Sequence, residues 1–215
     1  MSAFKVGYFV GSLSKASINR KLSLALRFAE PASLGELLTR SSCASSLRIL
    51  SVIMAGRVSF ADARFERLEQ LTLEAYEIHL AGLSAPSLRS LSVEFSMLPT
   101  KLESCFTGLD TPVLEHFQLT AHVHDYWDHH SGPLQSHLAD TLHLPAFSRL
   151  RSLTLRTKEG SLPYHRGLAQ LFARMPARPT LERIDLREAA LGPEARAELE
   201  AARSSLPELL LAERA

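Results

Sequence analysis

Hydrophobic residues recur along the chain in one short pattern: a leucine, two variable positions, an apolar residue, one variable position and a second apolar residue. This leucine pattern starts at Leu47, Leu68, Leu88, Leu114, Leu150, Leu181 and Leu206. The two apolar residues that follow each leucine are two positions apart, so in a β-strand their side chains point to the same face. The pattern therefore predicts a series of short strands, each with one buried face.

The connections between the predicted strands are long. They leave enough chain to cross back over one face of a sheet, which neighbouring parallel strands require. Pro86, Pro112 and Pro179 each stand two residues before a pattern leucine, where the fixed φ of proline can end one connection before the next strand begins. A single unit of this kind cannot bury its apolar face alone, so stability must come from stacked neighbours. We expect an α/β fold built on a parallel sheet.

Polar residues occupy the positions that alternate with the buried ones in five of the predicted strands. They are Gln70, Thr72, Glu74, Ser90, Ser92, Glu94, His116, Gln118, Thr120, Ser152, Thr154, Arg156, Arg183, Asp185 and Arg187. The first strand, with Ile49 and Ile53, and the last, with Leu210 and Ala212, interrupt this polarity. An alternation of this kind is typical of a sheet that is buried on one side only, so we expect these residues to face solvent.

Over residues 42–211 the chain resembles the leucine-rich repeat family, of the ribonuclease-inhibitor-like, degenerate bacterial type. The resemblance implies a solenoid of about seven irregular repeats, with a curved parallel sheet on the concave side and helices or irregular segments on the convex side. It also implies that the polar positions given above bind a partner protein. Many such repeats carry an asparagine at the ninth position; here the only asparagine in the chain is Asn19, so we expect irregular bends.

Two outer helices are predicted. Residues 161–175 have Leu168, Leu171 and Phe172 spaced for one helical face. Residues 191–205 place Gly192 before Pro193, which is favoured at the first position of a helix, and continue with alanine-rich sequence. Residues 206–215 are expected to close the array as its last strand.

The N-terminal residues carry a different pattern. An apolar strand at 5–10 (KVGYFV) is followed by the loop GSLSKASIN at 11–19 and then by a predicted helix. Residues 4–29 thereby resemble the start of the NADPH-dependent FMN reductases, which are flavodoxin-like and hold the flavin phosphate at such a strand–loop–helix. The resemblance implies FMN as cofactor and Ser12, Ser17 and Asn19 as its phosphate contacts.

The rest of that family's pattern does not follow, because the Pro-Glu-Tyr-Asn string of its flavin-ring loop is missing. We therefore interpret residues 1–33 as a strand–helix cap on the first repeat and residues 34–215 as the repeat domain. A truncated FMN reductase-like oxidoreductase segment that binds flavin phosphate is the alternative.

An insertion at residues 121–132 (AHVHDYWDHHSG) concentrates histidine and aromatic residues. His122 and His124 share strand parity with His116, and imidazoles two apart on a strand can share a metal ion. In the other interpretation the insertion is polar and solvated, and Tyr126 and Trp127 contact the array or a partner. We assign no metal site and add Tyr126 and Trp127 to the predicted partner-binding residues.

Composition narrows the function further. A net charge of +1 argues against a nucleic-acid partner, and no apolar stretch is long enough to span a membrane. Cys43 and Cys105 lack the spacing of a metal site, and we expect two reduced thiols and a cytoplasmic protein. No nucleophile elbow or paired Cys and His is recognisable. The sequence predicts a non-catalytic module without a cofactor that binds a partner protein.

Overall fold

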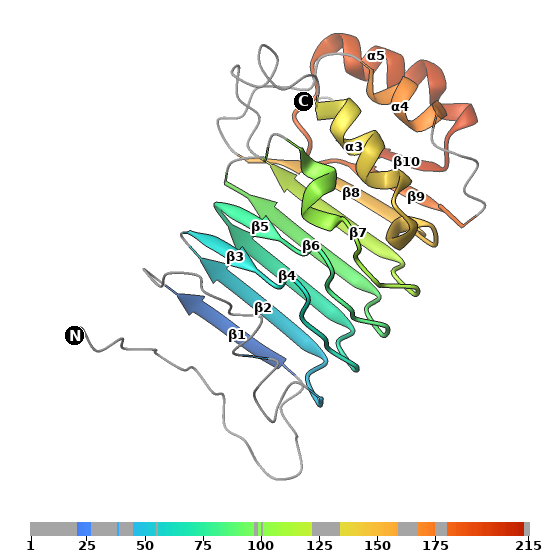
Figure 1. Ribbon diagram of the computed structural model, residues 1–215. Coiled ribbons are helices and arrows are strands. Elements are labelled where there is room, and N and C mark those ends of the chain that lie inside the picture. Colours follow the sequence, from blue (N-terminus) through green and yellow to red (C-terminus); the bar gives the residue numbers. More distant parts are fainter. Residues whose placement is uncertain are drawn as a thin grey trace.

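The computed structural model describes residues 21–26, 38, 45–54, 56–96, 99, 101–121, 134–158, 167–174 and 180–212. Within them, eight strands form one parallel sheet in the order β1-β2-β4-β6-β7-β8-β9-β10 (Figure 1). The strands are β1 (Lys21–Leu26), β2 (Ile49–Met54), β4 (Gln70–Ala75), β6 (Ser90–Phe95), β7 (His116–Ala121), β8 (Ser152–Thr157), β9 (Arg183–Leu186) and β10 (Glu208–Leu211). The predicted α/β class with a parallel sheet is confirmed.

Each strand from β2 to β10 in this sheet begins two residues after a pattern leucine, as the alternation predicts. The parallel register then aligns the fourth residues of the patterns across the sheet. This column consists of Leu50, Leu71, Leu91, Phe117, Leu153, Ile184 and Leu209, none of which is more than 3% exposed. The inward half of the alternation is therefore confirmed, and it follows from the need to remove these side chains from water.

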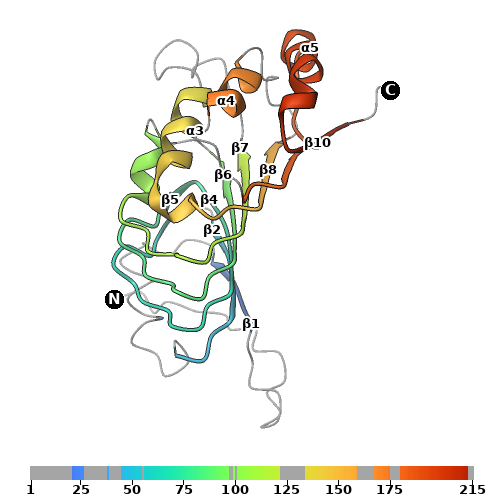
Figure 2. The same ribbon diagram turned by 90° about the vertical axis from the view of Figure 1, so that its right-hand side faces the viewer.

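The connections form a second layer on one side of the sheet (Figure 2). In the first half of the chain this layer is extended: β3 (Arg57–Ser59) pairs in parallel with β5 (Glu77–His79). Further along it contains the 3₁₀ turns η1 (Leu102–Phe106) and η2 (Pro145–Phe147) and the helices α3 (Leu134–His143) and α4 (Leu168–Arg174). Helix α5 (Pro193–Ala202) packs beside α4 and continues into η3 (Arg203–Ser205).

Both predicted outer helices are found in the described residues. Leu168, Leu171 and Phe172 of α4 are buried, as their spacing predicts. Helix α5 starts at Pro193 directly after Gly192, whose extended backbone ends the preceding segment. Proline suits this position because the first amide of a helix has no intrahelical acceptor, so nothing is lost by removing its N–H group.

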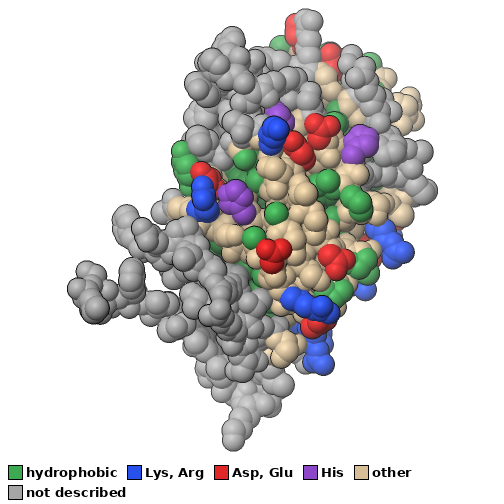
Figure 3. Space-filling model, in the orientation of Figure 1, with side chains coloured by type: hydrophobic (Ala, Val, Ile, Leu, Met, Phe, Trp, Pro, Cys, Tyr) green, Lys and Arg blue, Asp and Glu red, His purple; other side chains and the backbone are tan. Residues whose placement is uncertain are grey.

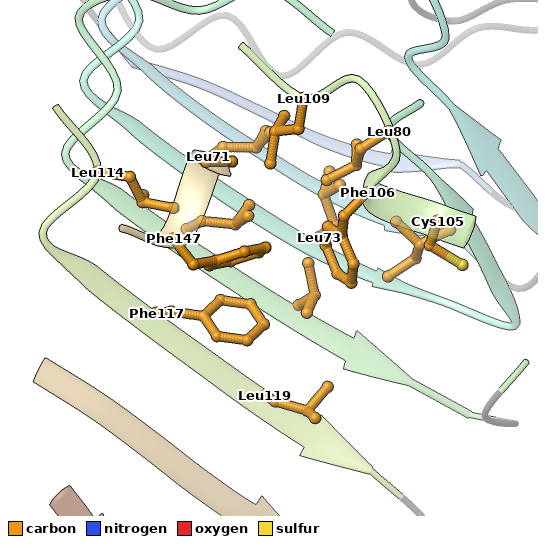
Figure 4. Packing of buried hydrophobic residues seen from close by; sticks show 14 of the residues in the cluster. Leu71, Leu73, Leu80, Cys105, Phe106, Leu109, Leu114, Phe117, Leu119 and Phe147 are labelled. Atoms are coloured by element: carbon orange, nitrogen blue, oxygen red, sulfur yellow. The ribbon is translucent and has the colours of Figure 1, made fainter. Parts of the chain in front are cut away.

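The core lies between the sheet and the outer layer (Figure 4). At its centre Phe117 of β7 meets Phe147 of η2 at a ring-centroid distance of 4.8 Å and Phe106 of η1 at 5.8 Å. Phe106 and Phe147 are also in edge-on contact, at 5.6 Å. These three rings come from one strand and two turns, so they fasten the outer layer to the sheet.

Three equivalent turns in the outer layer share a left-handed residue. Asp62, Gly82 and Gly108 have φ angles of 56°, 74° and 72°. The Asp62 amide donates to the Ala81 carbonyl and the Gly82 amide to the Thr107 carbonyl, at 3.1 and 3.0 Å, so the turns lie next to one another. Glycine has no Cβ to oppose a positive φ, which accounts for two of the three residues.

Strand β1 corrects the prediction for the N-terminal residues. The resemblance to FMN reductases implies a helix after residue 19, whereas Lys21–Leu26 form a strand that pairs in parallel with β2. The segment KLSLAL has leucine at every second position, a two-residue period that suits a strand and not a helix. The strand predicted at 5–10 and the remainder of the proposed cap lie outside the described residues.

Candidate interaction surface

The outward side chains of the eight-stranded sheet form a surface that we call the polar face. Among the predicted partner-binding residues on it, Gln70, Thr72, His116, Arg183 and Arg187 are exposed, and Glu74, Ser90, Ser92, Glu94, Gln118, Ser152, Thr154, Arg156 and Asp185 are half-buried. The register places them in rows that cross the sheet, as in the row of Thr72, Ser92, Gln118, Thr154 and Asp185. The middle of this face therefore presents mainly short hydroxyl and amide side chains.

Thr120 is an exception, because it is only 7% exposed and the expectation that it faces solvent is wrong. A long-range ion pair spans the strand that carries it. Lys158 follows β8, and its Nζ lies 2.6 Å from the Glu94 carboxylate on β6. Strand β7 runs between these two strands, so the lysine side chain crosses β7 where Thr120 stands.

Most charges on the polar face are neutralised locally. Arg187 is 2.6 Å from Asp185, and the hydrogen bonds that it donates hold the pKa of that carboxyl below its usual value. Arg183 pairs with Glu208 at 2.8 Å, joining the last two strands. Ion pairs at a solvated surface contribute little to stability. Because each pair joins opposite charges, the polar face carries no large patch of one sign among its described residues.

Two large apolar side chains stand out near the carboxyl ends of β2 and β4. Ile53 is 49% exposed and Tyr76 is 42% exposed, and they are the exposed large hydrophobic residues of the part of the chain that the structure describes. Neither residue is among the predicted binding residues. Ile53 could have been found as a break in the polar alternation, and Tyr76 as the residue at the ninth position of its pattern.

A row of alternating charges lies at the other end of the strands, and sequence reasoning missed it too. The residue after each of the first six pattern leucines is, in order, Arg48, Glu69, Arg89, Glu115, Arg151 and Glu182. Arg48 pairs with Glu69 and Arg89 with Glu115, both at 2.9 Å, and Arg151 pairs with Glu182 at 2.6 Å. We call these six residues the charge row. A hollow of about 690 Å³ opens beside its second half, with Arg149 and Thr180 in its lining.

The opposite side of the molecule, which carries β3, β5 and α3, shows no comparable organisation among its described residues (Figure 3). Acidic and basic side chains are scattered over it or stand next to each other. Arg57 donates a hydrogen bond to Glu77 and lowers the pKa of that carboxyl. Beneath this side, burial raises the pKa of the Cys105 thiol to about 11, so the thiol stays protonated at neutral pH.

Several predicted site residues lie outside the described residues: Ser12, Ser17 and Asn19 of the FMN alternative, and His122, His124, Tyr126 and Trp127 of the insertion. In the described ranges, no three His, Cys, Asp or Glu side chains come together in a group that could hold a metal ion. None of the described helices is long and apolar enough to cross a membrane.

Comparisons of this chain with protein-family models, with curated proteins and with solved structures found no match.

Proposed function

We propose that this chain is a leucine-rich-repeat domain of the ribonuclease-inhibitor-like type and that it works as a non-catalytic interaction module in the cytoplasm. In this proposal, a partner protein binds to the polar face. The observation that carries the proposal is the unbroken parallel register, which places the outward residues of successive leucine patterns side by side in rows.

The dimensions of the polar face suit a protein partner. Eight strands at a spacing of about 4.8 Å, six residues long at about 3.3 Å per residue except for the shorter β9 and β10, define a strip of roughly 34 by 20 Å. Its area is about 700 Å², close to the 800 Å² or so that each partner contributes to an interface of ordinary size. A small-molecule site would instead require a concave pocket with a few converging polar groups.

The chemistry of the face also supports protein recognition. Ser92 and Thr154 stand in the middle row and carry short side chains that a partner can approach closely. Ion pairs surround this middle region towards both ends of the strands. Interfaces commonly combine such a polar rim with a few larger anchors that carry most of the binding energy.

The test uses two variants and the wild type as affinity baits in a lysate of the source organism. Replacing both Ser92 and Thr154 by Arg fills the middle row with long charged side chains, whereas Ala61→Arg adds one such side chain to the outer layer, at an exposed turn. We expect a partner that the wild type and Ala61→Arg retain and that the double variant loses at least tenfold, measured by quantitative mass spectrometry and then with the purified partner.

Thermal melting of all three proteins provides the control for folding. A partner that the double variant retains as well as the wild type, while melting stays cooperative in each protein, would show that the polar face is not the binding surface.

The proposal does not extend to FMN. The alternative of a flavin-binding oxidoreductase segment depends on a phosphate loop that leads into a helix, and β1 occupies that position with a strand. Its optical test is simple: a purified protein that keeps flavin is yellow, and one that does not is colourless.

A further inference from the structure

One part of the polar face combines exposed apolar surface with an incompletely compensated charge. Ile53 of β2 is the register partner of Glu74 on β4, so the two residues are lateral neighbours. Tyr76 lies at the bend directly after β4, two residues beyond Glu74. An aliphatic residue beside Glu74 and an aromatic residue two positions after it are thus each more than 40% exposed. We call these three residues the anchor patch.

Glu74 shares the Lys158 ammonium group with a second carboxylate. Glu74 and Glu94 are register neighbours on β4 and β6, so their like charges lie close together. Lys158 approaches them from β8 and comes within 2.6 Å of Glu94, but only within 3.9 Å of Glu74. One positive charge between two carboxylates leaves this cluster with a net negative charge.

Glu74, whose distance to Lys158 is the longer of the two, is also the most exposed of these three side chains. The Glu74 side chain is 40% exposed, that of Glu94 30% and that of Lys158 28%. Lys158 reaches Glu74 from the β6 side, so the side of Glu74 that faces Ile53 of β2 stays accessible. Asp185 and Glu208, two other carboxylates of the polar face, each have an arginine within 2.8 Å.

We propose that Ile53, Glu74 and Tyr76 dock a partner segment in which a lysine or arginine stands next to a large apolar residue. The cation pairs with Glu74 and lies against the Tyr76 ring, a contact that favours arginine because its planar group stacks on aromatic rings. The apolar neighbour covers Ile53 and excludes water from the ion pair, which strengthens it. This inference rests on the proposed function and specifies the chemistry of its partner.

A random-peptide phage library provides the probe. We expect peptides selected on the wild type to carry Lys or Arg within two residues of a large apolar side chain. A synthetic peptide from this set is then titrated by fluorescence polarisation against single variants. Glu74→Gln is expected to weaken binding about fivefold and Glu74→Arg more than tenfold, as for removal and reversal of a desolvated charge. Ile53→Ser and Tyr76→Ser are each expected to weaken peptide binding about fivefold or more, as is common when a large interface residue is truncated.

Lys158 supplies a variant that is expected to change affinity in the opposite direction. Lys158→Met removes the cation that competes for Glu74, so the peptide should bind two- to fivefold more tightly. Ala61→Arg, on the outer layer, should leave the affinity unchanged. Cooperative melting of each variant shows that it is folded.

Four results would overturn the inference: recovery of no peptide specific to the wild type, selected peptides without a preference for cations, equal binding of the peptide to Glu74→Arg, or self-association of the wild type that Tyr76→Ser abolishes. If the Ser92→Arg and Thr154→Arg double variant loses a captured partner while the Glu74 variants keep it, the proposed function stands and the anchor patch is wrong. If neither the double variant nor any anchor-patch variant loses a partner, both fail.

Discussion

Truncation of Phe117 tests the packing that joins the sheet to its outer layer. Phe117 is 1% exposed, and its ring contacts Phe147 and Phe106. Replacement of a buried phenylalanine by alanine costs about 3–5 kcal/mol, through lost burial and the cavity that remains. Two ring contacts, each worth about 0.5–1.5 kcal/mol beyond burial, place Phe117→Ala in the upper half of that range, at about 4 kcal/mol.

The loss is measured by urea unfolding, followed by circular dichroism. A loss of about 4 kcal/mol lowers the melting temperature by roughly 8–16 °C in a chain of this length. The urea dependence of the free energy should not change, because the variant exposes the same surface on unfolding. A loss below about 1 kcal/mol, well outside the range for a buried ring, would refute the packing described above.

A double-mutant cycle isolates the ring contact from simple burial. Phe117→Leu and Phe147→Leu both keep an apolar side chain in place but remove the facing rings, whose centroids are 4.8 Å apart. We expect a coupling free energy of about 0.5–1.5 kcal/mol between them. Strict additivity would mean that the two rings do not interact.

Three further predictions concern the charge row, the buried thiol and the sheet edge. Glu115→Arg should lower the free energy of unfolding by about 0.5–1 kcal/mol because it removes the pair with Arg89 and places a like charge between Arg89 and Arg151, and Glu115→Gln, which removes the pair without adding a charge, should lower it by less; equal losses in both variants would contradict this. Because the pKa of Cys105 is about 11 in the folded chain and 9.0 otherwise, unfolding releases its proton above pH 9, so stability should fall as the pH rises from 9 to 11, and fall less in Cys105→Ala, in urea titrations. Deleting residues 1–33 removes β1 and should make the chain self-associate through the freed edge of β2, as seen by light scattering; a monomeric truncation of equal stability would show that β1 is not needed as an edge.

The sheet could be predicted from the sequence because its determinants are local. A buried column requires only that apolar residues alternate, and the leucine patterns give the start of each strand from β2 onward in the main sheet. Helix α5 could be predicted equally well, since Gly192 and Pro193 mark its start. Strand β1 was missed although Leu22, Leu24 and Leu26 alternate in the same way, because the preceding loop suggested a helix by resemblance.

The features that were missed depend on lateral neighbours. The buried Thr120 lies on β7, between the two strands that the Lys158–Glu94 ion pair connects. The charge row exists only once the patterns are aligned, because its members lie 20 to 36 residues apart in the chain. Likewise, Ile53 and Tyr76 become neighbours of Glu74 through the register of β2 with β4 and the bend after β4.

The charge row also bears on how the chain chooses its strand order. The buried columns are nearly uniform in leucine, so they match almost as well if a strand pairs with the next but one and skips its neighbour. The charge row does not match in such a pairing. Adjacent strands place Arg beside Glu, whereas pairing with the next strand but one places Arg48 beside Arg89 or Glu69 beside Glu115. Each exposed pair contributes little stability, but the alternation penalises every such misordering with like charges. We infer that the charge row determines the order in which the strands pair, whereas the hydrophobic columns only hold the strands together. Reversing one charge should therefore disturb refolding more than native stability.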